Sequence, residues 1–331
     1  MTASTFRFEG PSIEQTTVEA ALSPFRAAAL RHGNLTTTVP RELVHRAAVA
    51  EVMLTDWKRL ADAHFAMTAQ WPRGHSFFTP VDGVHHDPLI AAETIRQIGA
   101  LLAHAEFGVP FGHQFLLEEL TLTVHPEQLR IGQTPAALDI DVTCKEVRKR
   151  AGRLTGLAYE TTVLREGRPA ASGRISFSAI APAVYRRLRP ERVFSAGHRP
   201  IPLTAPVAPQ SVGRLSPADV VLSPTGDPNR WQLRVDTRHP VLFDHQVDHV
   251  PGMVLLEAAR QAATAVLGRS SILPLGLECE FKKYAELDLP CLIDGLRLPK
   301  AAPGDPDTVL VTGHQDGEPV FSTMVTAALG D

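Results

Sequence analysis

One five-residue stretch occurs twice in this chain, as Glu93-Thr94-Ile95-Arg96-Gln97 and as Glu257-Ala258-Ala259-Arg260-Gln261. The two copies lie 164 residues apart. The same gap-free spacing also pairs His75 with His239 and His85 with His249. So many polar matches in one register indicate an internal duplication. Because the period is far longer than that of a solenoid repeat, each copy is expected to be a whole domain.

Length and composition are typical of a globular protein with two domains. The chain has 331 residues, of which 44% are hydrophobic and 21% charged. The chain has a net charge of −3 and so lacks the excess of basic residues that nucleic acid binding requires. No apolar run reaches the roughly 20 residues that span a bilayer, and residues 1–6 form no signal region. We therefore expect a cytoplasmic protein with no nucleic acid or membrane partner.

Hydrophobic periodicity predicts short strands, one long helix and then several antiparallel strands in each half. In the first half, Ile95, Ile98, Leu102 and Ala105 form one stripe of a helix over 88–107, with Asp87 as its N-cap. The second helix is expected over 251–267. Strands are expected at 49–54, 63–71, 113–124, 137–147, 154–164 and 169–180, and again at 219–222, 230–235, 274–285, 290–298, 308–312 and 319–327. This order predicts an α+β fold in which a curved antiparallel sheet wraps a central helix in each half.

A segment rich in proline and arginine separates the halves. It runs from about residue 181 to 215 and contains Arg186, Arg187, Arg189 and Arg192. We expect an N-terminal extension at 1–35, a first domain at 36–182, a linker at 183–214 and a second domain at 215–331.

Each predicted helix carries a Glu, an Arg and a Gln on one face, at spacings of three and four residues. The trios are Glu93, Arg96 and Gln97, and Glu257, Arg260 and Gln261. In the second helix the apolar stripe of Leu255, Ala259, Ala262 and Val266 lies on the opposite side. One interpretation is a solvated face, where each Glu–Arg pair contributes about 0.3 kcal/mol. The other is a functional pocket, favoured by the apolar residues 89–90 and 253–254 beside the trios, because a charge in apolar surroundings must be paired or used.

Histidines precede both helices and favour a polar pocket near each helix start, although each one alone also fits a structural role. They are His75, His85 and His86 in the first half and His239, His245 and His249 in the second. A metal site at 85–87 is disfavoured, because adjacent side chains rarely converge on one ion and no His-x-x-x-His pair lies on a helix. We expect neither a metal nor a cofactor.

Several catalytic motifs are absent from the sequence. It contains no Gly-x-Ser-x-Gly, no phosphate-binding loop and no Gly-x-Gly-x-x-Gly. Cys144, Cys279 and Cys291 form no Cys-x-x-Cys pair and are predicted to pack as small apolar residues. What remains is a helix-borne Glu that can deprotonate a hydroxyl and an Arg that can hold an anion.

Several stretches resemble known families. Residues 250–258, Val-Pro-Gly-Met-Val-Leu-Leu-Glu-Ala, resemble the start of the central helix in hotdog-fold β-hydroxyacyl-carrier-protein dehydratases. More specifically, the motifs at 38–40, 44–52, 70–76, 86–89, 112–115 and 239–245 are similar to those of the A-factor synthase (AfsA) family of actinomycetes. The resemblance runs from about residue 36 to the end. Gln246 departs from the pattern, which has proline after Asp244-His245, and this affects only a local turn.

The resemblance implies two fused hotdog domains packed side by side, so that a monomer contains an internal pseudo-dimer. It implies an acyltransferase that moves a β-ketoacyl chain from acyl carrier protein to the free hydroxyl of dihydroxyacetone phosphate, for the biosynthesis of γ-butyrolactone-type signalling molecules. Glu257 is then the general base and Arg260 the group that holds the phosphate or the oxyanion. Substrate-binding roles are expected for Glu93, Arg96, Gln97, Gln261, His245 and His249. Direct attack on the thioester is the simplest mechanism.

Other functions stay open at this point. A hotdog thioesterase or dehydratase would use the same carboxylate, and a non-catalytic acyl-binding signalling protein would share the fold. Acyl length and branching are not determined, nor is the choice between a γ-butyrolactone and a related butenolide or furan product. Because acyl carrier proteins are acidic, the four linker arginines are a candidate docking surface, with a merely solvated linker as the alternative.

Overall fold

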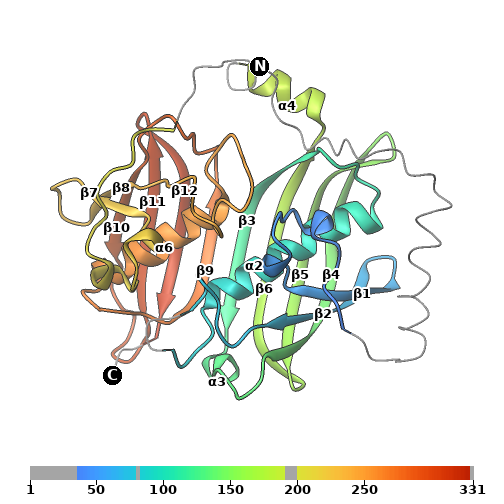
Figure 1. Cartoon of the computed structure of the whole chain (residues 1–331), viewed down its shortest axis with the longest axis horizontal. Coiled ribbons are helices and arrows are strands. Elements are labelled where there is room, and N and C mark those ends of the chain that lie inside the picture. The colour runs from blue at the N-terminus through green and yellow to red at the C-terminus, as the bar shows by residue number, and fades with distance from the viewer. Residues whose placement is uncertain (1–35, 80–82, 191–199, 329–331) are drawn as a thin grey trace.

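The computed structural model describes residues 36–79, 83–190 and 200–328, which form two similar halves joined through one sheet (Figure 1). The N-terminal extension expected at 1–35 lies outside the described residues. Among the described residues, no helix is both long enough and apolar enough to cross a membrane.

The sheet has twelve strands, and their order is the same in each half when read from the outside inwards. In the first half the order is β1 (Leu54–Ala61), β2 (His64–Trp71), β4 (Ala136–Arg150), β5 (Arg153–Arg165), β6 (Arg168–Ile180) and β3 (Gln114–Val124). In the second half it is β7 (Leu222–Pro224), β8 (Arg230–Leu233), β10 (Leu292–Arg297), β11 (Asp307–Gln315), β12 (Glu318–Ala327) and β9 (Pro274–Phe281). β3 and β9 pair antiparallel at the centre. The expected pair of hotdog domains packed as a pseudo-dimer is thereby confirmed.

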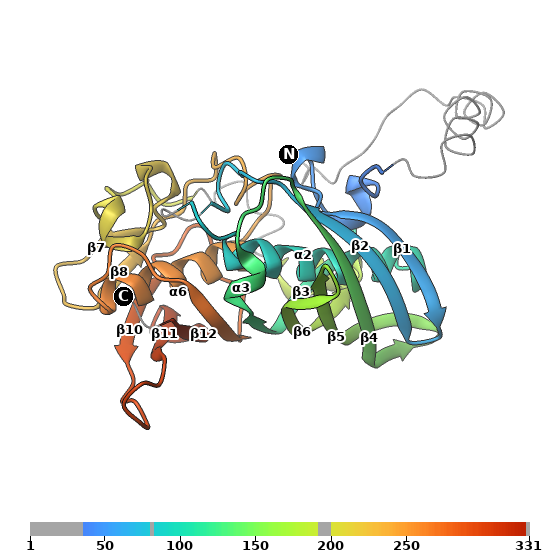
Figure 2. The same ribbon diagram turned by 90° about the horizontal axis from the view of Figure 1, so that it is seen from below.

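Each half wraps its sheet around one long helix, α2 (Pro88–Leu101) or α6 (Gly252–Val266). The Asp87 side chain accepts a hydrogen bond from the backbone N–H of Leu89 at 2.9 Å, so the predicted N-cap of α2 is confirmed. α2 continues as a π-turn, η3 (Leu102–Glu106), before the chain enters β3. Figure 2 shows the outer strands β1, β2 and β4 curling around α2. The remaining short helices are η1 (Arg41–Val44), η2 (Val49–Glu51), α3 (Pro126–Leu129), α4 (Pro182–Leu188), η4 (Pro209–Val212) and η5 (Pro217–Asp219).

Two of the expected strands are wrong at their start. The stretch 49–54 begins as the 3₁₀ turn η2, and the strand starts only at Leu54. The stretch 219–222 likewise follows the turn η5, and β7 starts at Leu222. In both places a backbone N–H, that of Met53 or Val221, donates to a glutamine of the central helix. It therefore does not pair with a neighbouring strand. These segments therefore cover the helices and add no length to the sheet.

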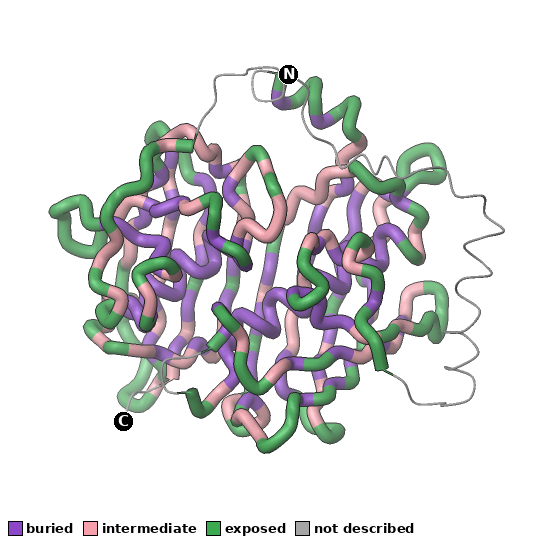
Figure 3. The backbone as a smooth tube through the Cα atoms, viewed as in Figure 1, coloured by how far each residue is buried: buried purple, intermediate pink, exposed green. Residues whose placement is uncertain are grey.

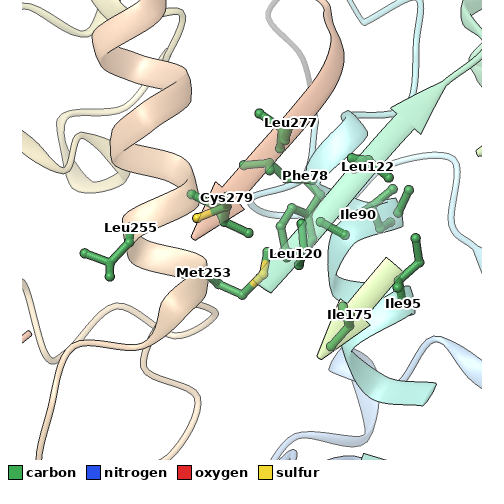
Figure 4. Close-up of a cluster of buried hydrophobic side chains, with 14 of the residues drawn as sticks. Phe78, Ile90, Ile95, Leu120, Leu122, Ile175, Met253, Leu255, Leu277 and Cys279 are labelled. Atoms are coloured by element: carbon green, nitrogen blue, oxygen red, sulfur yellow. The ribbon is translucent and has the colours of Figure 1, made fainter. Parts of the chain in front are cut away.

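The core is continuous from one half to the other. Both helices are buried along almost their whole length (Figure 3). At the seam, Leu120 of β3 lies opposite Cys279 of β9, and Leu122 lies opposite Leu277. Figure 4 shows Met253 of α6 approaching these residues from one side and Ile90 of α2 from the other. All of these side chains are buried, so the two helices share one apolar layer over the central strands.

The start of the expected linker is ordered against the second half. Tyr185 of α4 donates its hydroxyl to Asp248, and Arg189 forms a bidentate pair with Glu286 at 2.7 and 2.8 Å. Arg189 is 8% exposed, so the expectation that it belongs to a carrier docking surface is wrong. Arg186 and Arg187 are exposed, and Arg192 lies outside the described residues.

Candidate active site

The two helix glutamates lie at the centres of matching buried networks. In the second half, Arg214 and Arg260 donate through their Nε atoms to the Glu257 carboxylate at 2.8 and 2.9 Å, and Gln261 donates to it as well. In the first half, Arg46 and Arg96 donate in the same way to Glu93 at 2.9 and 2.8 Å. Both glutamates are 0% exposed. The solvated-face interpretation is therefore wrong, because η1, η2, η4 and η5 cover this side of the helices.

The arginines keep both carboxylates ionised. Burial alone opposes ionisation, but the charges and hydrogen bonds of Arg214 and Arg260 outweigh it and hold the pKa of Glu257 at about 2. Arg46 and Arg96 hold the pKa of Glu93 at about 2 in the same way. Each carboxylate is thus an anchor for two guanidinium groups, of which those of Arg46, Arg214 and Arg260 are buried and that of Arg96 is partly exposed. As a proton acceptor it is weak for as long as both arginines stay in contact with it.

The helix glutamines bind the covering segments. Gln97 accepts a hydrogen bond from the Met53 N–H at 2.9 Å and donates to the Glu51 carbonyl at 2.7 Å. Gln261 repeats both contacts with the Val221 N–H and the Asp219 carbonyl, at 3.0 and 2.8 Å. The helix trios are therefore the groups that hold the 3₁₀ segments in place.

Two buried arginines, Arg46 and Arg214, each form a hydrogen bond with the other half. Arg46 of the first half donates to the Val241 carbonyl of the second half at 3.2 Å. Arg214 donates to the Phe77 carbonyl of the first half at 2.6 Å, with its guanidinium 4.0 Å from the centre of the Phe77 ring. These reciprocal contacts make each network depend on a loop of the other half. Sequence reasoning missed both arginines, because they lie 168 residues apart and so fall outside the register of 164.

The duplicated histidines His75 and His239 have matching structural roles. His75 Nδ1 accepts from the N–H groups of Phe77 and Phe78, both at 3.1 Å. His239 Nδ1 accepts in the same way from residues 241 and 242, at 3.2 and 3.1 Å. The opposite ring nitrogen of each histidine faces a carboxylate, that of Glu51 at 3.3 Å or Asp219 at 3.2 Å. These imidazoles shape the loops that receive the crossing arginines.

The structure separates the two histidines that were expected to bind substrate. His249 contacts the Asp248 carboxylate at 2.7 Å and the Tyr284 ring, beside α4. His245 follows Asp244, whose carboxylate accepts hydrogen bonds from the N–H groups of Ala47 and Ala48 in the first half. His45 was not singled out as a candidate, although it precedes Arg46 in one of the family motifs. Its Nε2 is hydrogen-bonded to Nε2 of His104 at 2.7 Å.

The three cysteines are unsuited to nucleophilic catalysis. All are buried, as predicted. Burial raises the pKa of Cys144 to about 11 and those of Cys279 and Cys291 to about 12. They are therefore protonated thiols at neutral pH.

Comparison with known proteins agrees with the duplication. The A-factor biosynthesis hotdog domain matches residues 28–181 and again residues 196–329. The chain belongs to this family. A Streptomyces virginiae relative named 2-oxo-3-(phosphooxy)propyl 3-oxoalkanoate synthase is 57% identical over 291 residues, which cover 88% of this chain and 98% of that protein. A Streptomyces griseus relative with the same name is 44% identical, and the match covers 86% of this chain and 94% of that protein.

Solved structures support the fold. A Lactobacillus plantarum protein named as an oleoyl thioesterase superposes with a TM-score of 0.51, covering 82% of this chain and 99% of its own. The two sequences are only 11% identical, so this likeness concerns the double hotdog architecture and not the reaction.

Proposed function

We propose that this protein is an acyltransferase that joins a β-ketoacyl group to the free hydroxyl of dihydroxyacetone phosphate. The observation that carries the proposal is the name shared by the relatives at 57% and 44% identity. A 2-oxo-3-(phosphooxy)propyl 3-oxoalkanoate is the ester of a 3-oxo fatty acid with that phosphorylated alcohol. The near-complete coverage of both proteins extends the proposal to the whole of this chain.

The acyl donor in the proposal is a β-ketoacyl thioester of acyl carrier protein. The hydroxyl oxygen of the acceptor attacks the thioester carbonyl, a C–O bond forms, and the C–S bond breaks. The hydroxyl proton ends on the released thiol. Because the cysteines are buried and protonated, direct transfer without an acyl-enzyme fits this chain best.

Glu257 and Arg260 stay the proposed catalytic pair, with Glu93 and Arg96 as their counterparts. The contacts of Glu257 set a condition on its role as a base, because its carboxylate must first lose an arginine contact. An anionic substrate group that draws Arg260 away would remove the charge that lowers the pKa of Glu257. Binding of the acceptor and activation of its hydroxyl would then be coupled.

The direct test supplies purified enzyme with a β-ketoacyl carrier protein, with and without dihydroxyacetone phosphate, and follows the products by mass spectrometry. The proposal expects the phosphorylated ester only when the acceptor is present. Free β-keto acid released at equal rates in both reactions would identify a thioesterase instead. A panel of acyl chains in the same assay determines the preferred length and branching.

A further inference from the structure

Four histidines from separate segments lie in one part of the first half, where Arg96 donates to the carbonyl of Val44, the residue before His45, at 3.2 Å. His45 follows η1, His104 lies in the π-turn after α2, His113 precedes β3, and His245 comes from a loop of the second half. His45 Nε2 lies 2.7 Å from His104 Nε2, and both rings pack on Phe115. Asp244, the residue before His245, accepts hydrogen bonds from the N–H groups of Ala47 and Ala48, and the charges of His113 and His245 lower the pKa values of His104 and His45, respectively. We call these four residues the histidine cluster.

The second half has no equivalent of His45. The residue before Arg214 is Gly213, just as His45 precedes Arg46. Both end a 3₁₀ turn in the left-handed conformation, with φ of 69° for Gly213 and 54° for His45. A Cβ at Gly213 would lie 3.1 Å from Nη1 of Arg260. One of two otherwise matching networks therefore carries an imidazole at a position where the backbone itself favours glycine.

Arg96 is more available to a ligand than Arg260. The Arg96 side chain is 25% exposed and that of Arg260 is 5% exposed. Three carboxylates act on Arg260, those of Glu257, Asp87 and Asp219.

The carboxylates of Glu93 and Asp244 act on Arg96. The second of these already accepts hydrogen bonds from the N–H groups of Ala47 and Ala48. An anion at Arg96 thus meets a more accessible cation than it would meet at Arg260.

The hydrogen bonds of the histidine cluster determine which nitrogens can bind a ligand. His104 Nδ1 lies 2.6 Å from the Val109 carbonyl, which can only accept, so this nitrogen carries the proton. In the neutral pair, His104 Nε2 is then the acceptor and His45 Nε2 the donor. Within the described residues, His45 Nδ1 has no hydrogen bond and His113 Nδ1 is buried without one, whereas His245 Nδ1 lies 3.5 Å from the Asp244 carboxylate. His45, whose neighbour Val44 binds Arg96, therefore holds an unused nitrogen close to a guanidinium.

His45 is neutral in the free protein and would gain a proton when an anion binds. Burial, followed by the charges of His104, Arg96 and His245, lowers the pKa of His45 to about 3. The other charged groups near it are Arg46, Glu93 and Asp244, which belong to the ion pairs described above. A phosphate dianion beside Arg96 would offset the positive charge of Arg96, which lowers the pKa of His45, so the pKa of His45 would rise. Protonated His45 then becomes a donor through Nδ1.

The start of α6 packs against β3, the strand that carries Phe115. α6 begins without a side-chain cap. The Cβ position of Gly252 lies 3.5 Å from Leu117, two residues after the Phe115 that stacks on His45. The partial positive charge of a helix N-terminus favours bound anions.

We infer that the phosphate group of the acceptor substrate binds in the first half, beside Arg96, with His45 and His245 as further donors. The inference rests on the proposed function for the identity of the substrate. It moves the phosphate from Arg260, its expected position, to the half where the arginine is accessible and the histidine cluster lies.

The test is calorimetric titration of the full-length protein with dihydroxyacetone phosphate at pH 7, in two buffers of different ionisation enthalpy. The wild type should take up protons on binding. The variant H45G copies the residue of the second half and suits the left-handed backbone. It should raise the Kd roughly tenfold to a hundredfold, because a charge-assisted hydrogen bond is lost, and it should reduce the proton uptake. Its KM for the β-ketoacyl thioester should change by less than about twofold.

Three further variants complete the test. H245N should also weaken binding, and it gives the answer if H45G fails to fold. H64N is the matched control, because His64 is an exposed histidine of β2 paired with Asp141, and it should bind as the wild type does. Wild-type affinity in both H45G and H245N would overturn the inference, as would a larger loss in R260Q than in H45G. Ester formation by H45G with an unchanged KM for the acceptor would reject the subsite and leave the proposed function standing. If the wild type binds dihydroxyacetone phosphate but forms no ester, the proposed function is rejected and the phosphate subsite stands.

Discussion

At the scale of single residues, the two buried glutamates link the site to the stability of the fold. Each compensates two guanidinium groups that burial would otherwise penalise, and each of those networks reaches into the other half through Arg46 or Arg214. Substitution of either glutamate therefore alters both the proposed chemistry and the packing of the halves.

We expect E257Q to lose transferase activity and also to lower the free energy of unfolding, by about 3–5 kcal/mol, because two buried arginines lose their counter-charge. Urea denaturation monitored by circular dichroism measures the change, with E93Q as the matched variant and E160Q as the exposed control. A stability equal to that of the wild type would show that the arginines do not need this carboxylate.

Stability should begin to fall at a pH above the range in which carboxylates titrate. Burial is the main cause that lowers the pKa of His45 to about 3 and that of His86 to about 4 in the folded protein. The folded state therefore binds fewer protons than the unfolded state, so stability is lost as the pH falls from about 6.5. Each of these histidines contributes a slope of up to about 1.4 kcal/mol per pH unit. The ionised Glu93 and Glu257 add losses only below about pH 4.5.

Urea midpoints measured from pH 7.5 to 4.5 test this expectation. H45G should flatten the dependence between pH 6.5 and 5, and H64N should not. A wild-type stability that stays level from pH 7.5 down to pH 5 would contradict the expectation that His45 and His86 stay neutral in the folded protein.

At the scale of elements, the central helices could be predicted and their surroundings could not. The apolar stripe of α2, the cap at Asp87 and most strands follow from periodicity within one segment. The burial of the trios depends on short 3₁₀ segments, whose sequences have no period to detect. The sequence did not reveal that Arg46 and Arg214 correspond to each other. The chain from 219 to 239 is four residues shorter than that from 51 to 75, so residues before these stretches no longer match at a spacing of 164. The histidine cluster combines four segments, so no local pattern indicates it.

The packed side of α6 should respond to truncation as an ordinary core. Leu255 is 2% exposed, so L255A should cost about 2–5 kcal/mol by leaving a cavity. V266A should cost less, because Val266 is only partly buried near the end of the helix. Thermal unfolding of both variants provides the measurement. Activity per folded molecule should stay close to that of the wild type, and an unchanged melting temperature for L255A would remove this residue from the core.

At the scale of the whole molecule, we propose that the chain is a monomer whose halves take the place of two subunits. The β3–β9 pairing and the crossing arginines join the halves. Residues 211–331 expressed alone should self-associate or precipitate, because the fragment exposes the edge of β9 and leaves Arg214 without the Phe77 carbonyl. Size-exclusion chromatography with light scattering distinguishes the outcomes. A monodisperse, folded monomer of the fragment would contradict the pairing, and the full chain is the control.

Arg186 and Arg187 of α4 are exposed, so they remain candidates for docking of the acidic carrier protein. The double variant R186S/R187S should raise the KM for the acyl carrier protein substrate about threefold to tenfold at low salt, since rim charges act mainly on association rate. Activity with a small acyl thioester should be unchanged. Equal losses with both substrates would place these residues in the fold, and no loss with either would place docking elsewhere.

The glycine and the histidine that precede the two crossing arginines show what gene fusion makes possible. In a symmetric homodimer each mutation appears twice, so neither site can change without the other. In a fused chain, natural selection acts on each copy separately. His45 and Gly213 occupy matching positions with matching backbones, yet only one carries a side chain. One copy can therefore specialise in recognition of a ligand while the other does not, a division of labour closed to an enzyme built from identical subunits.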